Sequence, residues 1–422
     1  MNLPPVERAG TITNRRVFLQ RTAAMALMPA LLPTLRSGLW HEPSRYAQPA
    51  RRPRPTRAQL DWQRDELALF CHFGVNTFTN REWGDGREDP SIFNPTALDC
   101  REWTRAAKAC GAKALILTAK HHDGFCLWPT ATTNHSVKSS PFRNGTGDLV
   151  REFVDACRAD GLRPGLYLSL WDRNHPAYGD SPRYNDVYRA QLTELLTRYG
   201  SIHEVWFDGA NGEGPNGKRQ QYDWPATWSL VRRLQPNAVM FSDAGPDVRW
   251  IGNERGVAGE TNWSTVRPEI VPVPGLEGAE VMRSLQQGDR DGTVWRPGET
   301  DVSIRPGWFW HPAEDEKVRS AENLEQLWFT SVGRNSKLLL NVPPTTSGRF
   351  HDTDVANLRR MRERLDTRFA DQVTHSARRR FEVLSDTSAT LTLSLPRPVA
   401  IGAVDLREDI AQGQRVAAFV LE

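Results

Sequence analysis

The sequence is poor in cysteine, in net charge and in long apolar runs. Five cysteines among 422 residues are an odd number, and no two of them form a C-x-x-C pair. Neither a disulfide framework nor a cysteine-based metal site is therefore expected, and we interpret the cysteines as buried free thiols. A net charge of +3, with both signs interspersed along the chain, does not indicate a nucleic-acid or membrane partner.

The amino-terminal segment has the pattern of a targeting signal. Arg15-Arg16 precedes Phe18-Leu19 and an apolar run from Ala23 to Leu32. This run is shorter than the roughly 20 residues that a membrane helix needs. Twin arginines before such a run resemble a bacterial twin-arginine export signal. We expect residues 1–50 to be signal peptide and linker, and the mature protein to be periplasmic or extracellular, with no membrane partner after the signal is removed.

Short apolar segments alternate with amphipathic ones from Asp61 to about residue 375. The pattern predicts strands over 67–76, 114–120, 164–170, 202–208, 238–243 and 337–342. It predicts helices over 97–110, 148–160, 185–199, 224–234, 317–332 and 352–368. The stretch after Asp243 is irregular and gives no clear sixth strand, and Trp308–Trp310 is taken as the next element.

About eight such units over residues 51–375 suit a (β/α)8 barrel with insertions. A doubly wound parallel sheet is the alternative, but no G-x-G-x-x-G follows the first predicted strand, as its nucleotide-binding form would require. After residue 376 the apolar residues recur with a period of two, in Phe381–Val383, Ala389–Leu395 and Val404–Leu406. Residues 376–422 are therefore expected to form the first part of a carboxyl-terminal β-sandwich.

The most informative stretch is Glu204-Val205-Trp206-Phe207-Asp208-Gly209, in which an apolar strand pattern runs into one carboxylate and a glycine-rich break. Barrel enzymes keep their catalytic groups at such strand ends. Other predicted strand ends supply several histidines, aromatics and Arg249, and Glu254 follows the fifth strand. A site with two carboxylates, neutral hydrogen-bond donors and aromatic rings is typical of a glycosidase. Asp208 would be the nucleophile, kept ionised by histidine donors or Arg249, and Glu254 the general acid.

Two other functions use the same residues. A metal-dependent hydrolase could coordinate its ion with His72, His121, His122 and Asp208, which are ligand types. Against it, the first strand offers a single histidine, and neighbouring residues of a strand point to opposite faces, so His121 and His122 converge only if the strand has already ended. A catalytically weak, sugar-binding protein is the alternative from another class.

Four segments together resemble the α-L-fucosidases of glycoside hydrolase family 29: Phe70–Gly74, Leu117–Pro129, Gly165–Ser169 and Val205–Gly209. The Lys-His-His-Asp-Gly-Phe sequence within the second segment is specific in combination with Trp-Phe-Asp-Gly in the fourth. The resemblance covers residues 60–375. It implies a barrel enzyme that releases terminal α-L-fucose with retention of configuration, without metal or cofactor, from fucosylated oligosaccharides or glycoconjugates. The binding-protein alternative would then be a catalytically weak, fucose-binding protein on the same scaffold.

The resemblance also implies roles for individual residues. Asp208 matches the nucleophile. The substrate-binding residues are expected to be His72, Glu82, Trp83, His121, His122, Tyr167 and Trp206, together with Arg249 from the strand-end set. The segment from Arg249 to Glu254 looks like the subgroup specific for α-1,3/1,4-linked fucose. It points to Glu254 as the acid/base, with Glu260 in reserve.

Overall fold

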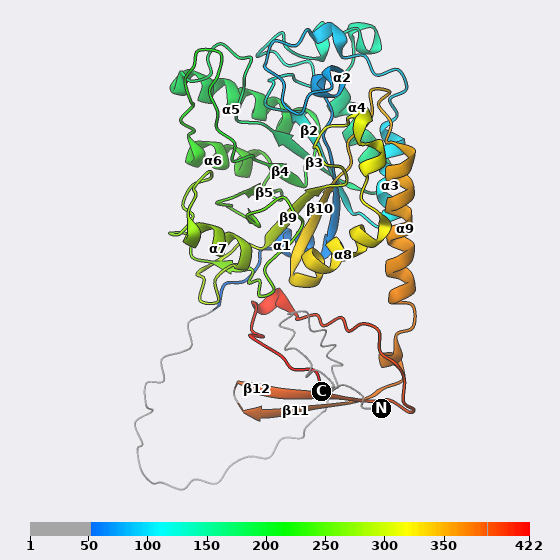
Figure 1. Cartoon of the computed structure of the whole chain (residues 1–422). Coiled ribbons are helices and arrows are strands. Elements are labelled where there is room, and N and C mark those ends of the chain that lie inside the picture. The colour runs from blue at the N-terminus through cyan, green and yellow to red at the C-terminus, as the bar shows by residue number, and fades with distance from the viewer. Residues whose placement is uncertain (1–51, 386) are drawn as a thin grey trace, which may run out of the picture.

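The barrel is closed and consists of eight parallel strands (Figure 1). The computed structural model describes residues 52–385 and 387–422, so the predicted signal segment lies outside the described residues. Around the barrel the strands follow the order β1-β10-β9-β6-β5-β4-β3-β2. They are β1 (Leu67–Cys71), β2 (Ala114–Lys120), β3 (Arg163–Leu168), β4 (Glu204–Trp206), β5 (Val239–Ser242), β6 (Val248–Trp250), β9 (Gly298–Ser303) and β10 (Ser336–Asn341). The predicted TIM-like barrel is confirmed.

Helices surround the barrel, and acidic or hydroxyl side chains cap several of their amino ends. Asp99, Asp148 and Ser320 each accept a hydrogen bond from the first turn of the helix that follows, which satisfies a backbone N–H that lacks a helical partner. The helices are α1 (Arg57–Asp65), α2 (Val75–Thr79), α3 (Cys100–Cys110), α4 (Leu149–Ala159), α5 (Ser181–Arg198), α6 (Trp224–Leu234), α7 (Ala279–Gln287), α8 (Ala321–Ser331) and α9 (Asp352–Arg368). Within the described ranges, none of them combines the length and the apolar character that a membrane span requires.

Two barrel strands were missed by the sequence pattern. The sixth strand is β6, and the seventh is β9 rather than the segment Trp308–Trp310, which is an irregular loop after β9. β9 has the sequence Gly-Glu-Thr-Asp-Val-Ser, and all six residues are buried. Its carboxyl and hydroxyl side chains break the apolar run by which buried strands are recognised. A two-stranded antiparallel sheet of β7 (Thr265–Val266) and β8 (Val294–Trp295) lies between these two strands in sequence.

The inside of the barrel contains a buried charge cluster beneath a layer of aromatic rings. Lys337 Nζ donates to Glu204 Oε2 at 2.8 Å and lies 3.5 Å from Glu299 Oε2. Burial, and next the charge of Glu204, raise the pKa of Glu299 well above its usual range, so Glu299 is held in its neutral form. Trp206 Nε1 donates to Glu299 Oε1 at 3.0 Å, and this bond ties the cluster to the aromatic layer.

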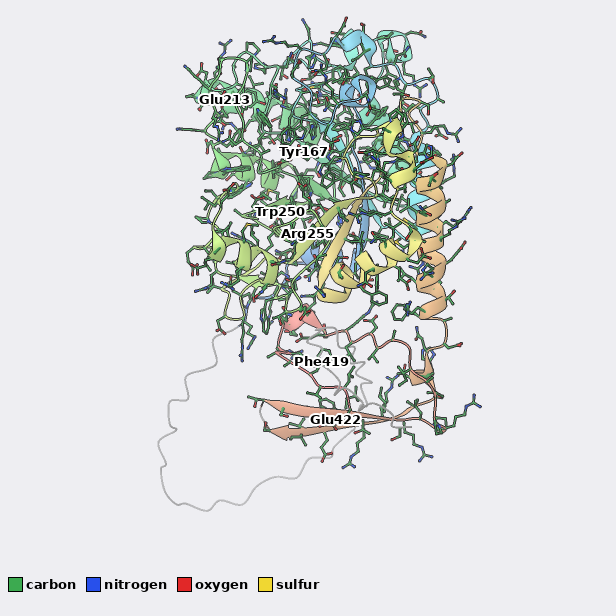
Figure 2. All side chains as sticks on the ribbon, viewed as in Figure 1. Tyr167, Glu213, Trp250, Arg255, Phe419 and Glu422 are labelled. Atoms are coloured by element: carbon green, nitrogen blue, oxygen red, sulfur yellow. The ribbon has the colours of Figure 1, made fainter. Side chains whose placement is uncertain are left out.

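The carboxyl-terminal part is an antiparallel hairpin of β11 (Arg378–Ser385) and β12 (Ser388–Ser394). The third predicted strand, Val404–Leu406, has no regular secondary structure. Figure 1 places this part below the barrel, and in Figure 2 Phe419 and Glu422 lie there, apart from Tyr167 and Trp250 in the barrel. The tail contacts the barrel where Gln414 Oε1 accepts from Ser264 N at 2.8 Å.

Replacing Lys337 by Met should destabilise the fold strongly. The substitution removes the cation from a buried group of two carboxyls, and such a loss costs about 3–5 kcal/mol. Denaturant unfolding of both proteins measures this difference. Lys317→Met makes the same change at an exposed lysine and should shift stability by less than about 0.5 kcal/mol. Equal losses of unfolding free energy in the two variants would show that the buried cluster stabilises the fold no more than an exposed lysine does.

Candidate active site

The candidate site lies at the carboxyl ends of the barrel strands, and Asp208 is at its centre. Asp208 follows β4, and its side chain is 27% exposed. Tyr167 OH, from β3, donates to Asp208 Oδ2 at 3.0 Å, and the backbone N–H of Ala210 donates to Oδ1 at 2.7 Å. His122 Nε2 lies 3.8 Å from Oδ2. Both oxygens of one accessible carboxylate are thus stabilised by neutral donors, which suits a group that attacks while ionised.

Three histidines line the site beside Asp208. The ring of His121 lies 4.1 Å from that of His122 and 5.5 Å from that of His72. β2 ends at Lys120, directly before the pair, so the backbone is free to turn both rings to one side, as the sequence required. Burial lowers the pKa of His72 to about 3, and burial also lowers the pKa values of His121 and His122. All three rings are therefore neutral near pH 7.

Neutral histidines can serve as hydrogen-bond donors and acceptors for a sugar. His72 Nδ1 is 2.8 Å from Asn341 Oδ1, and His122 Nδ1 is 2.7 Å from Ser169 Oγ, so each ring is oriented by a fixed neighbour. His121 differs from the other two, since its buried Nδ1 has no hydrogen-bond partner within residues 52–385 and 387–422. A buried polar atom without a protein partner is costly unless a ligand or water satisfies it.

A buried ion pair between Lys120 and Asp172 stabilises the segment that carries His121 and His122. Lys120 Nζ donates to Asp172 Oδ2, Tyr184 OH and Gln191 Oε1, each at 3.0 Å. Lys120 directly precedes the histidine pair, and Asp172 directly follows Trp171. The pair therefore ties the end of β2 to the loop after β3 and fixes the two segments that supply these rings.

Aromatic side chains form the lower wall and the rim of the site. Trp206 stacks on Phe241 with ring centroids 4.1 Å apart, and its indole is anchored from below by Glu299. Trp83 is 57% exposed and stands edge-on to Trp171, at 5.9 Å, and to His122. A large exposed aromatic beside a polar site is a suitable platform for the apolar face of a sugar ring.

Glu254 and Glu260 lie in different parts of the molecule. Glu254 Oε2 accepts from Trp308 Nε1 at 3.3 Å. Partial burial of the Glu254 carboxyl raises its pKa, and although the Trp308 bond opposes this, the charges of Asp208 and Glu82 raise it further. Glu260 is 81% exposed and pairs with Arg334, which precedes β10 and so lies toward the amino ends of the strands. Glu254 alone of the two is placed to work with Asp208.

Arg249 is not brought to the site, contrary to the expectation from the sequence. Its guanidinium is buried and donates to the carbonyl oxygens of Leu285 and Arg296 and to Asn262 Oδ1. The neighbours Val248 and Trp250 pack with residues of the barrel interior. Because side chains alternate along a strand, Arg249 between them points outward. The Asp208 carboxylate therefore accepts its hydrogen bonds from Tyr167 OH and the backbone N–H of Ala210, and not from Arg249.

Glu82 is at the site, but its carboxylate contacts protein. Glu82 Oε1 accepts from Trp308 N at 2.5 Å, and Oε2 accepts from Phe309 N at 3.3 Å. His311 Nε2 lies 3.1 Å from the same Oε2. The remaining predicted binding residues, His72, Trp83, His121, His122, Tyr167 and Trp206, are brought together around Asp208.

Several site residues were missed in the sequence. Asn341 ends β10 and orients His72, and a polar residue at the end of a predicted strand could have indicated it. Ser169 could have been found in the same way. Trp308 was missed because its segment, Trp308–Trp310, was taken as the next regular element of the barrel although it is a loop. Asp301 lies on the unpredicted β9, where Trp250 Nε1 donates to it at 2.8 Å and burial raises its pKa well above the usual range.

Asp243 is a further carboxyl group whose pKa is affected by Asp208. Asp243 follows β5 and accepts from Gly275 N at 3.0 Å. Burial, together with the charge of Asp208, raises the Asp243 pKa to about 6.

Among the residues that the structure describes, no three His, Cys, Asp or Glu side chains are grouped so that they could hold a metal ion.

Comparison with known proteins identifies the family. Residues 87–368 match the sequence model of the family described as Alpha-L-fucosidase. Alpha-L-fucosidase 1 of Arabidopsis thaliana is 44% identical over 399 residues, which cover 88% of this chain and 77% of the plant protein. A glycoside hydrolase 29 family member from an unknown rumen bacterium is 46% identical with a TM-score of 0.74, over 79% of this chain and 60% of that one.

A second solved structure, a family 29 fucosidase of Ruminococcus gnavus in complex with fucose, is 33% identical with a TM-score of 0.71. The similarity covers 78% of this chain and 72% of that protein. The present chain thus spans less than two thirds of the rumen protein and about three quarters of the plant and Ruminococcus proteins. From the family model and from relatives that match most of its length, the chain belongs to the α-L-fucosidases of glycoside hydrolase family 29.

Proposed function

We propose that this chain is an exo-acting, retaining α-L-fucosidase that releases terminal α-L-fucose from glycans by double displacement. The observation that carries the proposal is the pair Asp208 and Glu254. One is an accessible carboxylate held by neutral donors, and the other is a carboxyl whose pKa is raised by burial and, to a lesser extent, by the charge of the first. Such a difference between two carboxyls separates the nucleophile from the acid.

In the first step, an oxygen of Asp208 attacks C1 of fucose while Glu254 gives its proton to the glycosidic oxygen. The C1–O bond to the leaving group breaks, and a fucosyl ester of Asp208 forms with inverted configuration. In the second step, Glu254 takes a proton from water as that water attacks C1 from the side the leaving group left. The ester bond breaks, Asp208 is regenerated as a carboxylate, and fucose departs with its original configuration.

The charge of Asp208 supports both roles of Glu254. Burial raises the pKa of Glu254, and while Asp208 is ionised its negative charge raises that pKa further, which favours the protonated form that acts as an acid. Once Asp208 is esterified it carries no charge, so this contribution to the Glu254 pKa disappears. Glu254 then loses its proton more readily, which is what the base of the second step needs.

The remaining residues bind the sugar. The neutral rings of His72, His121 and His122 suit the ring hydroxyls, and the unpartnered Nδ1 of His121 gives one such hydroxyl a buried partner. Trp206 and the aromatic layer below it offer an apolar surface to the C5 methyl group of fucose, which most other hexoses lack. The Ruminococcus relative solved with bound fucose supports this choice of sugar.

We further propose that the linkage cleaved is α-1,3 or α-1,4. The support is the segment Arg249–Glu254, which resembles the subgroup with that specificity and contains the acid/base at its end. Substrates are then fucosylated oligosaccharides or glycoconjugates in which fucose is a branch.

We also propose that the protein is exported through a twin-arginine pathway. The support is Arg15-Arg16 ahead of a short apolar run. Such proteins fold before export, and the five cysteines are all free and buried in the folded chain, in agreement with folding in a reducing compartment.

Azide should distinguish the two carboxyls. On an activated aryl α-L-fucoside, Asp208→Ala should lose at least about 10³-fold in kcat, because the covalent intermediate cannot form. Added azide should attack the vacated face and give β-fucosyl azide. Glu254→Ala should lose about 10²–10⁴-fold on substrates with poor leaving groups, and azide should intercept its intermediate to give α-fucosyl azide.

Glu260→Ala is the matched control, because it removes a carboxyl at the other end of the barrel and should behave like the unaltered enzyme. Retaining chemistry on these residues is refuted if Asp208→Ala turns over normally, or if azide gives the same anomer in both variants. A wild-type protein that binds fucose without turning over any fucoside would be a binding protein.

Linkage preference can be measured on natural oligosaccharides. We expect kcat/KM to be at least about tenfold higher for fucose linked α-1,3 or α-1,4 within a branched unit than for α-1,2- or α-1,6-linked fucose, as a pocket shaped for one aglycone discriminates against others. Release of free fucose from each substrate at equal concentration provides the comparison. Equal or reversed rates would place the chain outside that subgroup.

Export should depend on the arginine pair. In a bacterium with a twin-arginine pathway, Arg15→Lys/Arg16→Lys should leave the protein in the cytoplasm, while the unaltered chain reaches the periplasm. Immunodetection after cell fractionation gives the distribution. Arg378→Lys/Arg379→Lys, the same exchange at an exposed pair on β11, should not change it. If the first variant is exported as well as the second, the pair is not an export signal.

A further inference from the structure

Arg249 carries a positive charge into the protein interior on the outer side of β6. α7 packs against this side of the strand, outside the barrel (Figure 1). The guanidinium is buried, and its hydrogen bonds go to uncharged acceptors, the carbonyl oxygens of Leu285 and Arg296 and Asn262 Oδ1. Within residues 52–385 and 387–422 it forms no ion pair with a carboxylate. A buried charge is costly without an opposite charge beside it, so a partner is expected.

A second arginine, Arg296, lies beside Arg249 and also lacks a carboxylate partner in the part of the chain that the structure describes. Arg249 Nη1 donates to the Arg296 carbonyl oxygen. The Arg296 side chain is half-buried, and its Nε donates to the Pro246 carbonyl oxygen at 3.2 Å. Burial lowers the pKa of Arg249 to about 9; the charge of Asp289 opposes this shift, and the charge of Arg296 adds to it. The two cations therefore repel each other, and neither is neutralised by an ion pair.

The acidic residues whose charges act on these two arginines are paired elsewhere. Asp289 accepts from Ser284 Oγ at 2.7 Å and from Arg283 Nη2 at 3.0 Å. Asp247 accepts from Arg232 Nη2 with both of its oxygens, at 2.6 Å and 2.5 Å. Each of these carboxylates is thus already neutralised by an arginine of its own.

A small cavity is lined by both unpaired arginines. Its lining includes three arginines, Arg249, Arg267 and Arg296, and one acidic residue, Asp243. The Asp243 carboxylate accepts from Gly275 N, and in the described ranges it forms no ion pair with any of the three. The cavity has room for about one water-sized group, so it is too small for a phosphate, a sulfate or a sugar. A positively charged space of this size suits a monatomic anion.

We propose that this cavity binds one chloride ion between the guanidinium groups of Arg249 and Arg296. Among the described residues only Nε of Arg296 finds a hydrogen-bond acceptor, so its two terminal nitrogens can donate to the ion. The ion neutralises a charge that no carboxylate reaches. Because Arg249 lies on β6 and Arg296 directly precedes the start of β9, it also ties these two barrel strands together. The site is separate from the sugar site, and the inference does not depend on the proposed function.

Thermal unfolding of the full chain tests the site. The protein is dialysed into potassium gluconate, whose organic anion is too large for the cavity, and chloride then replaces gluconate at constant ionic strength. A ligand that binds only the folded state stabilises it, so Tm should rise by about 2–5 °C. The rise should saturate below about 0.15 M chloride, the physiological ionic strength. Arg296→Met removes one of the two cations and should abolish the rise. Arg290→Met, the same change at an exposed arginine, should retain it.

Bromide locates the ion directly. Crystals of the unaltered protein grown with bromide in place of chloride should show an anomalous scattering peak in contact with Arg249 and Arg296. This measurement needs no variant, so it decides the matter even if Arg296→Met does not fold. The proposal is overturned if chloride and gluconate give the same Tm, if the rise does not saturate or persists in Arg296→Met, or if the cavity holds only water in the bromide crystals. Turnover of aryl α-L-fucosides is measured separately, so a failure of the chloride site and a failure of the proposed function are distinguishable.

Discussion

Side chains alternate between the two faces of each barrel strand, and this alternation decides which residues reach the site. On β4, Glu204 and Trp206 face the interior, so Asp208 follows them to the open end of the barrel. On β6, the same rule directs Trp250 inward and Arg249 outward. On β9 it brings two carboxyls, Glu299 and Asp301, into the barrel. The distribution of charge at the site therefore follows from strand geometry.

The resulting environment favours one anion among neutral groups. Burial keeps the three histidines uncharged, so they contribute hydrogen bonds without neutralising Asp208. Glu299 is held neutral below, and Asp301 has a strongly raised pKa for the same reason. Glu254 reaches this environment from a loop, where a hydrogen bond from Trp308 orients it. The proposed nucleophile and the proposed acid are thus separated by their surroundings, although both are ordinary carboxyl groups.

Helices and strands could be predicted from the sequence wherever the local residue pattern decides the structure. The strand Ala114–Lys120 and the helices Trp224–Leu234 and Asp352–Arg368 have the bounds that their apolar periodicity predicts. β6 was missed because it is short, and β9 was missed because its interior residues are polar. Arg249 was misplaced because the strand that sets its direction was not recognised. The contacts of Glu82 could not be predicted, since nothing local shows that a carboxylate will accept backbone N–H groups more than 220 residues away.

The central claim is that Asp208 forms the covalent bond to fucose. A 2-deoxy-2-fluoro-α-L-fucosyl fluoride tests it most directly, because the fluorine slows hydrolysis of the glycosyl ester and lets the intermediate accumulate. Mass spectrometry of the intact protein and of its peptides would then locate the label. We expect one fucosyl group per chain, attached to Asp208 and absent from Asp208→Ala. A label on another carboxyl, or inactivation without any covalent label, would contradict it.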